Sequence, residues 1–495
     1  MDTVQKAGDI DDAIAQALPK HLDLYYGGAW HVPAGGYLAT VNPANQQVLA
    51  YAAIANAADI DAAAQAAHKG FLEWTKVPAA QKSAMLREIA RRLRLHVEEL
   101  ALLDSADCGN PVKEMRSDVM IAAGRIDYYA GLVHELKGET IPTADGALNY
   151  SVREPYGVVA RIAAYNHPLM FVAGKLAPAV AAGNSVIMKA PELAPLSSLR
   201  FAEIVDGVLP PGVLNIVTGG RECGEALVRH PLVKKVALIG SVPTGAAILR
   251  NAADKIMPVT LELGGKNPLV ICPDADLDKA VQGAISGMNF TWAGQSCGST
   301  SRCFVHESLY DRVIEQIREH LPKLHRCGVP TDPVTTMGCL ISEVQFNKVA
   351  KYIDIALTEG ARLIAGGQRP TDPALAKGWF MEATVFADVT PQMRIFKEEV
   401  FGPIVSIIKW SDEDQLIADV NSVEYGLAAS IWTNELARAH RLARRIEAGF
   451  VWINTCSSHY LGAHFGGYKK SGIGREEGLE ELLAYTQVKN IHVML

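Results

Sequence analysis

The amino-acid sequence predicts an α/β protein with two doubly wound domains in series. The first observation is length, because 495 residues are too many for one hydrophobic core. The second is an alternation of short β-rich runs with helical runs over residues 185–253, which indicates a parallel sheet covered by helices on both faces. The third is a further series of the same kind that begins at Asn267.

Before the first series, strand-like sequence is followed by helical sequence. Asn56 and Asp59 indicate a helix start, and Gly109-Asn110-Pro111 is a helix breaker. Apolar residues at three- and four-residue spacing predict a long helix just before that breaker. The elements expected in this part are an arm or short helix over residues 1–22, strands over 24–53, helices over 60–74, 79–105 and 112–134, and an extended run over 148–162.

The two alternating series and the C-terminus give the remaining elements. Strands are expected at residues 185–188, 213–217, 235–239, 267–272 and 303–306, and helices at 199–208, 224–228, 246–253, 280–292, 310–320 and 347–359. Residues 485–495 alternate like a terminal strand, and we expect this strand to pair with residues 148–153.

Composition narrows the class of protein. Hydrophobic residues make up 49% and charged residues 20%, which is typical of a soluble globular chain. The net charge is −7, and no basic run suggests nucleic acid or a membrane surface as a partner. No apolar run reaches the roughly 18 residues of a membrane span, and the acidic N-terminus argues against a signal peptide. Eight scattered cysteines indicate reduced thiols, so we expect a cytoplasmic protein.

Two short segments carry residues suited to covalent catalysis. The sequence L-E-L-G-G-K-N-P at residues 261–268 offers the carboxylate of Glu262, and G-Q-S-C-G at 294–298 offers the thiol of Cys297. Cysteine is a strong nucleophile once deprotonated, and a nearby carboxylate can take a proton from water. A thiol and a carboxylate on separate loops are the minimum for covalent catalysis followed by hydrolysis.

Three further segments offer weaker signals, each with a structural alternative. Asn166 follows an expected strand, where its amide can donate to an oxyanion or simply form a turn. Lys189 and Glu192 lie at the end of another strand, where they can bind ribose hydroxyls or belong to a solvated loop. The segment I-G-S-V-P-T-G contains Gly240 and opens a helix at Gly245, so it suits a pyrophosphate or an ordinary turn, and it lacks the G-x-G-x-x-G pattern.

In their order, these motifs resemble the NAD(P)-dependent aldehyde dehydrogenase superfamily, in its hydrolytic, non-CoA-acylating type. The resemblance rests on L-E-L-G-G-K, G-Q-x-C, E-E-x-F-G-P and F-G-G-Y-K, and it extends from about Leu24 to the C-terminus. Taken singly, the last two motifs are no more than surface turns.

The resemblance implies a mechanism and its residues. The cysteine that matches Cys297 attacks the aldehyde carbon to give a thiohemiacetal. The asparagine that matches Asn166 and the backbone N–H of the cysteine stabilise the oxyanion. Hydride passes to the nicotinamide and leaves a thioester, and the glutamate that matches Glu262 activates the water that releases the acid. A secondary role in proton relay is implied for Lys175.

The resemblance also implies NAD as the preferred cofactor. Lys189 and Glu192 match contacts to the adenine ribose. A carboxylate near the 2′ position repels a 2′-phosphate, so NAD is expected over NADP, with NADP use left open. The other implied cofactor residues are Gly240, Ser241 and Gly245 on the pyrophosphate side and Glu399 and Phe401 on the nicotinamide-ribose side. No metal is implied.

The fold that the resemblance implies is a Rossmann-like cofactor domain, a catalytic domain and a small β oligomerisation arm. The NAD-binding domain is expected at residues 1–134 and 154–264, the catalytic domain at 265–475, and the arm at 135–153 and 476–495. Such an arm implies a homodimer or a homotetramer, and it supplies the partner for the terminal strand.

The expected substrate pocket departs from the family pattern. Relatives often carry aromatic residues at the positions of His167, Gly174 and His459. Glycine in place of a large ring predicts a wider pocket, and so a bulky or aromatic aldehyde instead of acetaldehyde. The histidines favour a hydroxyl or anionic group, or else point away from the channel, and the loss of aromatic walls weakens a betaine-aldehyde interpretation. The expected pocket residues are His167, Met170, Gly174, Ser296, His459 and Phe465.

Three alternatives stay open at the level of sequence. A CoA-acylating semialdehyde dehydrogenase would pass the acyl group to CoA, although Glu262 favours water as the acceptor. A fold-retaining binding or structural protein would have no need of the full catalytic set. A cysteine hydrolase without a cofactor would have no use for Lys189, Ser241 and Glu399.

Overall fold

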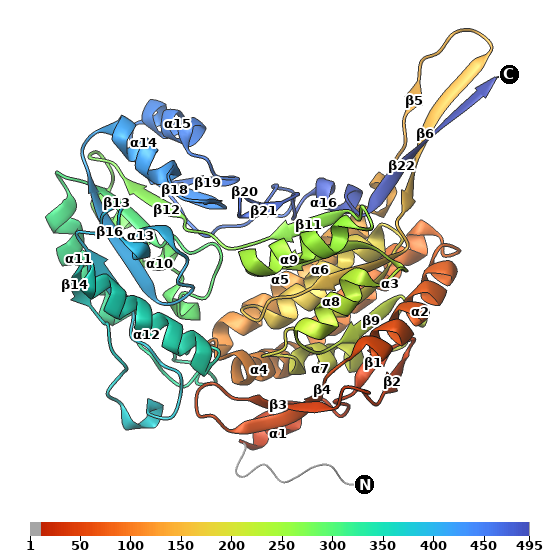
Figure 1. Cartoon of the computed structure of the whole chain (residues 1–495), viewed down its shortest axis with the longest axis horizontal. Coiled ribbons are helices and arrows are strands. Elements are labelled where there is room, and N and C mark those ends of the chain that lie inside the picture. Colours follow the sequence, from red (N-terminus) through yellow and green to blue (C-terminus); the bar gives the residue numbers. More distant parts are fainter. Residues whose placement is uncertain (1–10, 495) are drawn as a thin grey trace.

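The computed structural model describes residues 11–494 and contains two large sheets, one in each of two lobes (Figure 1). Two small antiparallel pairs, β3–β4 and β17–β20, and a three-stranded antiparallel arm accompany them. The predicted fold class, α/β with two doubly wound units and a β arm, is confirmed. The small pairs consist of β3 (Tyr37–Val41), β4 (Val48–Ala53), β17 (Tyr425–Gly426) and β20 (Tyr468–Lys469).

The first large sheet has eight strands in the order β2-β1-β9-β8-β7-β10-β11-β21. Its five central strands run parallel, and the others are antiparallel to their neighbours. The strands are β1 (Leu24–Tyr26), β2 (Ala29–His31), β7 (Val158–Ile162), β8 (Ser185–Lys189), β9 (Leu214–Val217), β10 (Val233–Ile239), β11 (Val259–Glu262) and β21 (Gly472–Ile473).

Helices cover both faces of this sheet, so successive strand residues enter different cores. Val159 of β7 packs in a cluster with α5, α6 and α7, whereas its neighbours Val158 and Ala160 pack with α2, α8 and α9. Both faces of the sheet are buried, which explains why these strands are continuous apolar runs in the sequence. The helices are α2 (Ala57–Trp74), α3 (Ala79–Leu95), α4 (Val97–Cys108), α5 (Val112–Gly131), α6 (Pro168–Ala181), α7 (Leu196–Val205), α8 (Arg221–Arg229), α9 (Val242–Ala253) and, near the C-terminus, α16 (Leu479–Leu483).

The second large sheet has seven strands in the order β14-β15-β16-β13-β12-β18-β19, and only β14 is antiparallel. One large apolar cluster joins it to its helices. The strands are β12 (Pro268–Ile271), β13 (Arg302–His306), β14 (Arg362–Ala365), β15 (Thr384–Ala387), β16 (Ile404–Trp410), β18 (Ala428–Trp432) and β19 (Phe450–Ile453). The helices are α10 (Leu277–Gly287), α11 (Tyr310–Leu324), α12 (Glu343–Thr358), α13 (Arg394–Lys397), α14 (Glu413–Asn421) and α15 (Leu436–Arg445).

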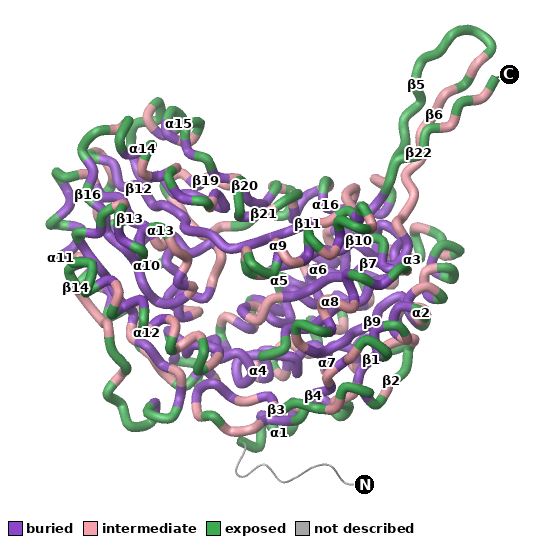
Figure 2. Tube along the Cα trace, in the orientation of Figure 1, coloured by how far each residue is buried: buried purple, intermediate pink, exposed green. Residues whose placement is uncertain are grey.

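The terminal strand finds the partner that its alternation predicts. β22 (Thr486–Met494) pairs with β6 (Ala147–Pro155) along its whole length, from Thr486 opposite Pro155 to Met494 opposite Ala147. β5 (Thr140–Ile141) pairs with the other edge of β6. The three strands project away from both large sheets, and most of their residues are exposed or half-buried (Figures 1 and 2).

Two local expectations need correction, and a third is met only in part. The helix expected over residues 79–105 is two helices, because His96 leaves the helical conformation (φ −114°, ψ 20°) between α3 and α4. The helix expected to open at Gly245 begins at Val242, because the Ser241 side chain accepts a hydrogen bond from the Thr244 N–H and caps it. Of the expected N-terminal arm or helix, α1 (Asp12–Ala17) is present, and residues 1–10 lie outside the described residues.

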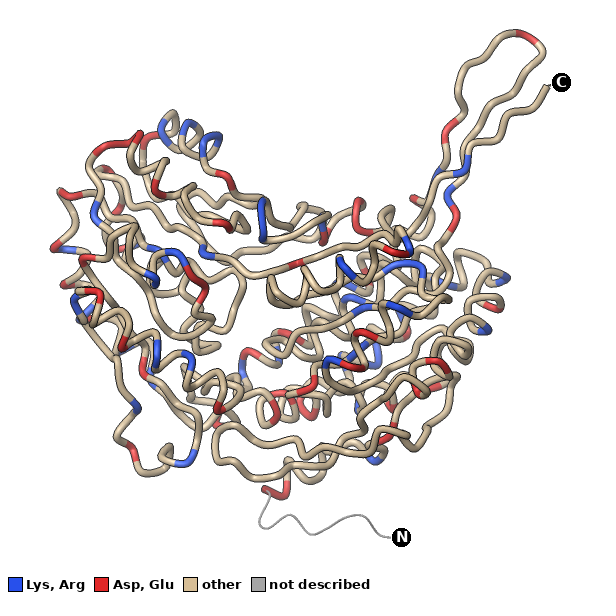
Figure 3. The backbone as a smooth tube through the Cα atoms, in the orientation of Figure 1, with Lys and Arg blue, Asp and Glu red and all other residues tan. Residues whose placement is uncertain are grey.

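Charge is mixed over the surface. Acidic and basic residues are both scattered over the whole molecule (Figure 3). Within residues 11–494, no helix is both long enough and apolar enough to cross a membrane.

Candidate active site

A cavity of about 750 Å³ opens at the carboxyl ends of the parallel strands of the first sheet. It is lined by the residues that follow β7, β8, β9, β10 and β11, and on the far side by residues of the second unit. In parallel sheets, strand ends meet at one edge, so side chains distant in sequence gather there. The predicted site residues that line it are Asn166, Lys189, Glu192, Gly240, Ser241, Glu262, Cys297, Glu399 and Phe401.

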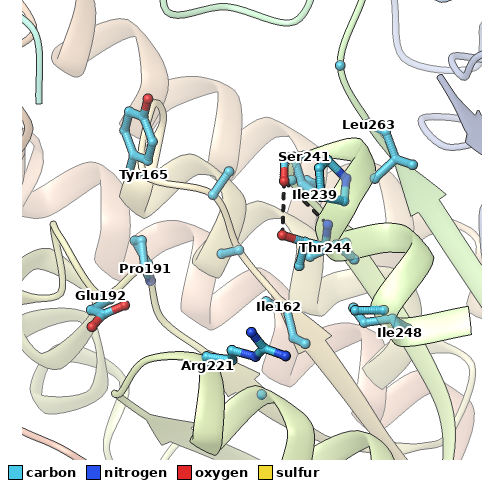
Figure 4. A pocket seen from close by; sticks show the side chains of 18 of the residues that line it. Ile162, Tyr165, Pro191, Glu192, Arg221, Ile239, Ser241, Thr244, Ile248 and Leu263 are labelled. Carbon is cyan, nitrogen blue, oxygen red and sulfur yellow. Dashed lines mark hydrogen bonds between the residues drawn. The ribbon is translucent and has the colours of Figure 1, made fainter. Parts of the chain in front are cut away.

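One end of the cavity is polar and open. Lys189 ends β8, and burial lowers the pKa of its ammonium, which donates to the Ala190 carbonyl at 3.3 Å. Glu192 is exposed in the next loop, and Arg221, at the start of α8, also lines the cavity; its side chain extends away from Glu192 (Figure 4) and donates to Glu225 at 2.8 Å. The sequence reasoning did not single out Arg221. Its only signal is its place in the first turn of a helix that follows a parallel strand.

The N-terminus of α9 lies beside this polar end. The hydroxyls of Ser241 and Thr244 are 2.9 Å apart, and both residues line the cavity (Figure 4). Unpaired N–H groups of a first helical turn suit a bound anion such as a pyrophosphate. Gly245 does not line the cavity. An added Cβ there would lie 2.7 Å from Cδ1 of Leu263, so this glycine serves the packing of α9 on β11.

Cys297 is held at the other end of the cavity by its main chain. The Asn267 side chain donates to the Cys297 carbonyl at 2.7 Å, and an added Cβ at Gly265 would come within 2.8 Å of that oxygen. Burial, and next the negative charges of Glu262 and Glu399, raise the pKa of the thiol to about 12. A thiol with this pKa needs a base or a positive charge nearby to ionise at neutral pH.

Glu262 ends β11 with its carboxylate buried against the same cavity. Glu262 is only 5% exposed, and its Oε1 has no hydrogen-bond partner among the described residues. Burial, and next the charge of Glu476, raise the pKa of this carboxyl well above its usual range, whereas Lys175 acts in the opposite direction. Such a carboxylate can accept a proton from water.

Asn166 and Glu399 complete this end of the cavity. The Asn110 side chain donates to the Asn166 carbonyl at 2.8 Å, while the Asn166 amide makes no hydrogen bond to the described residues and is free to donate. Oε1 of Glu399 accepts the Gly265 N–H at 2.9 Å, and burial raises the pKa of this carboxyl. Phe401 has a positive φ of 57° and meets the ring of Tyr165 edge-on.

Lys175 lies behind the cavity and does not line it. Its ammonium is 2.6 Å from Oε2 of Glu476 and 3.4 Å from Oε2 of Glu481, and Glu476 also pairs with the buried Arg161. These acids are among the charges that raise the pKa of Glu262. Lys175 thus belongs to a buried ion network behind Glu262, and its charge lowers the pKa of that carboxyl.

The predicted substrate residues also lie outside this cavity. His167 pairs with Asp118, and His459 pairs with Glu477 at 3.1 Å. Ser296 faces a small recess lined by Lys266, and Met170 and Phe465 are each 7% exposed. Lys266 is a further residue that the sequence reasoning missed; burial, and next Arg302, lower the pKa of its ammonium to about 7.

The open space expected above Gly174 is filled. An added Cβ at this position would lie 3.3 Å from the Cα of Ala122 and 3.3 Å from Cδ of Arg125. Arg125 is 7% exposed and forms an ion pair with Glu477, which in turn contacts His459. The missing side chain at residue 174 thus makes room for an arginine, not for a wider pocket.

Known proteins resemble the chain over nearly its whole length. The sequence profile of the aldehyde dehydrogenase family matches residues 30–491. Aldehyde dehydrogenase tropH of Talaromyces stipitatus is 50% identical over an aligned length of 489, and the alignment covers 97% of this chain and 95% of that protein. An aldehyde dehydrogenase from Bacillus cereus in complex with NAD⁺ superposes with a TM-score of 0.94 at 38% identity, over 98% of this chain and 99% of that one. Betaine aldehyde dehydrogenase from Staphylococcus aureus in complex with NAD⁺ gives a TM-score of 0.94 at 35% identity, over 98% and 97%.

Proposed function

The chain belongs to the aldehyde dehydrogenase family and is an NAD(P)-dependent aldehyde dehydrogenase. We propose that it oxidises a bulky or aromatic aldehyde to the carboxylic acid with NAD. One observation carries the proposed chemistry. A half-buried thiol, a buried carboxylate with an unpartnered oxygen, and an amide free to donate all line one cavity. These are Cys297, Glu262 and Asn166.

Each residue has one task in the proposed reaction. The Cys297 thiolate attacks the aldehyde carbon, and the Asn166 amide with the Cys297 N–H stabilises the oxyanion of the thiohemiacetal. NAD, when bound, would supply the hydride acceptor; as the oxyanion reforms the carbonyl, the thiohemiacetal carbon loses its hydride and the acyl group stays on Cys297 as a thioester. Glu262 then takes a proton from the water that attacks the thioester, so the acid leaves and the thiol is restored. Lys175 tunes Glu262 through Glu476 and serves as a proton relay.

The cavity fits a dinucleotide. Its volume of about 750 Å³ is in the range of cofactor sites, and the N-terminus of α9 beside Ser241 suits the pyrophosphate. We assign Lys189 and Glu192 to the adenine ribose, and Glu399 and Phe401 to the nicotinamide ribose. Glu192 repels a 2′-phosphate, so NAD is preferred, whereas Arg221 in the same cavity keeps NADP use open.

Aromatic rings on the substrate side support an aromatic aldehyde. The rings of Phe171 and Trp292 lie 5.4 and 5.6 Å from that of His167, and the ring of Phe465 lies 4.7 Å from that of His459. Flat apolar surfaces at this spacing favour a stacked or edge-on ring. Because Arg125 fills the space at Gly174, the proposed preference for an aromatic aldehyde rests on these aromatic rings and not on a wider pocket.

The arm supports assembly and the domain assignment. The arm is a three-stranded antiparallel sheet that projects from the body, with β22 as an edge strand. An exposed edge strand is suited to pair with another copy of the chain. We propose a homodimer or homotetramer in which residues 135–153 and 476–495 form the contact, residues 1–134 and 154–264 bind NAD, and residues 265–475 form the catalytic domain. Deletion of residues 486–495 should reduce the assembled mass measured by light scattering. All eight cysteines are free, which supports a reducing, cytoplasmic location.

A kinetic panel tests the proposed function. Aliphatic, aromatic, cationic and anionic aldehydes are offered with NAD and with NADP, and NADH or NADPH formation is followed by absorbance. We expect the highest kcat/KM for an aromatic aldehyde with NAD. A best substrate that is short and aliphatic would contradict the proposed substrate class. Acyl-CoA formation on addition of CoA would contradict the hydrolytic role of Glu262.

A further inference from the structure

His167 and Asp118 form a hydrogen-bonded pair beside the proposed oxyanion site. Nδ1 of His167 lies 2.7 Å from Oδ2 of Asp118. His167 directly precedes α6, and Asp118 lies on α5, which packs against α6. The Asp118 side chain is 4% exposed and that of His167 is 14% exposed. The preceding residue, Asn166, lines the cavity that contains Cys297.

The pairing determines what the other ring nitrogen can do. An ionised carboxylate can only accept a hydrogen bond, so Nδ1 of His167 carries the proton. Nε2 of the neutral ring is then an acceptor, and no described residue donates to it. With 14% of the His167 side chain exposed, Nε2 stays accessible and suits a ligand that brings a hydrogen-bond donor.

Aromatic side chains frame this acceptor. The His167 ring meets Phe171 edge-on and is tilted by 47° against Trp292. Trp292 ends the short segment that leads into the Cys297 loop, and its buried Nε1 has no hydrogen-bond partner among the described residues. Two unpaired polar atoms, the acceptor Nε2 of His167 and the donor Nε1 of Trp292, therefore lie among aromatic rings next to the loop that carries Cys297.

His459 is a weaker candidate for the same task. Its Nδ1 also faces a carboxylate, that of Glu477 at 3.1 Å, but its side chain is 37% exposed. A hydrogen bond to a solvated group discriminates little, because water replaces a missing partner. The buried pair of His167 and Asp118 is the one that can distinguish two similar substrates.

We propose, on the basis of the proposed function, that His167 is a specificity-determining residue that accepts a hydrogen bond from a hydroxyl group on the ring of an aromatic aldehyde. Asp118 is a positioning residue, because it fixes the proton on Nδ1 and so keeps Nε2 an acceptor. The substrate class is therefore hydroxylated aromatic aldehydes, which this residue separates from their unsubstituted analogues.

The test compares benzaldehyde with the three hydroxybenzaldehyde isomers. We expect the natural chain to prefer at least one isomer, by about tenfold in kcat/KM and mainly through KM, as one buried hydrogen bond provides. His167→Phe should abolish this preference and retain benzaldehyde oxidation, which shows that the variant is folded. Asp118→Leu should do the same, whereas Asp118→Asn should keep most of the preference, because an amide oxygen also accepts from Nδ1.

A matched histidine variant controls for non-specific effects. His464 is 51% exposed and faces Glu480, so His464→Phe should leave the preference and the activity unchanged. The proposal is overturned when no isomer is preferred by the natural chain, or when the preference survives in both His167→Phe and Asp118→Leu.

A binding measurement separates this proposal from the proposed function. Calorimetry of the same aldehydes with the NAD-saturated Cys297→Ala variant needs no turnover. When no aldehyde yields NADH, the proposed function fails, and tighter binding of a hydroxylated isomer that depends on His167 would still support the assignment. Equal binding with and without the His167 imidazole would overturn it.

Discussion

Replacing Glu262 with glutamine removes the carboxylate beside Cys297 and keeps the shape of the side chain. The structure indicates that no neighbour can take over its task. Glu399, the other buried carboxylate of the cavity, accepts the Gly265 N–H, and Glu476 pairs with Lys175 and Arg161. Replacing Glu262 should therefore remove the whole contribution of general-base catalysis, which lowers the steady-state kcat by about 10²–10⁴-fold.

The first turnover should respond differently from the steady state. The charge of Glu262 is one of the causes that raise the pKa of the Cys297 thiol, after burial. Removing this charge lowers the thiol pKa and favours the thiolate, so formation of the thioester should not slow in step with its hydrolysis. The variant should then produce a burst of one NADH per chain and accumulate the acyl-enzyme.

Rapid mixing measures the burst, and mass spectrometry of the quenched protein locates the thioester on Cys297. Glu480→Gln is the matched control, because this glutamate is 61% exposed on α16 and should change neither phase. A Glu262→Gln variant whose first turnover slows as much as its kcat, with no burst, would refute the reasoning. Glu262 would then activate the thiol instead of the water.

Four further predictions follow from named contacts. Cys297→Ala should abolish oxidation and leave the calorimetric Kd for NAD nearly unchanged; a large loss of affinity would place the thiol in the cofactor site. Because the pKa of Cys297 is raised to about 12, alkylation by iodoacetamide should accelerate as the pH rises through the neutral range, and Glu399→Gln should shift this profile to lower pH, since one raising charge is gone. An unshifted profile would contradict that electrostatic account. Glu192→Ser should increase kcat/KM for NADP relative to NAD by about tenfold, because the carboxylate that repels a 2′-phosphate is gone; an unchanged ratio would remove Glu192 from the ribose site. Gly174→Ala should lower the thermal midpoint, because overpacking against Ala122 costs about 1–3 kcal/mol and the helix gains only about 1 kcal/mol from alanine; a higher midpoint would show that α5 and α6 separate easily.

Much of the fold follows from local pattern. The capping box of Asn56 and Asp59 starts α2 where the sequence indicates a helix, and the alternation of residues 485–495 predicts β22 and its partner β6. These signals are local, since a cap acts within one turn and a strand face repeats every second residue. The break at His96 escaped prediction, because the apolar spacing continues across it while the helix axis does not.

The pocket on the substrate side shows the limit of reasoning from single positions. Glycine at residue 174 indicates free volume only when its neighbours are known, and here Arg125 from another helix occupies that volume. Likewise, nothing in the sequence links His167 to Asp118, which is 49 residues earlier. Such pairs depend on how α5 and α6 pack.

By itself, the sequence determined the kinds of chemical group and their order along the chain: an amide after one strand, a carboxylate after another and a thiol in a later loop. Only the tertiary structure decided the surroundings of these groups. It buries Oε1 of Glu262 where no described residue hydrogen-bonds to it, pairs Lys175 with Glu476 behind the cavity, and raises the pKa of Cys297. The reason is physical, because burial and charge act through space, between residues that can lie more than 300 positions apart, as Lys175 and Glu481 do.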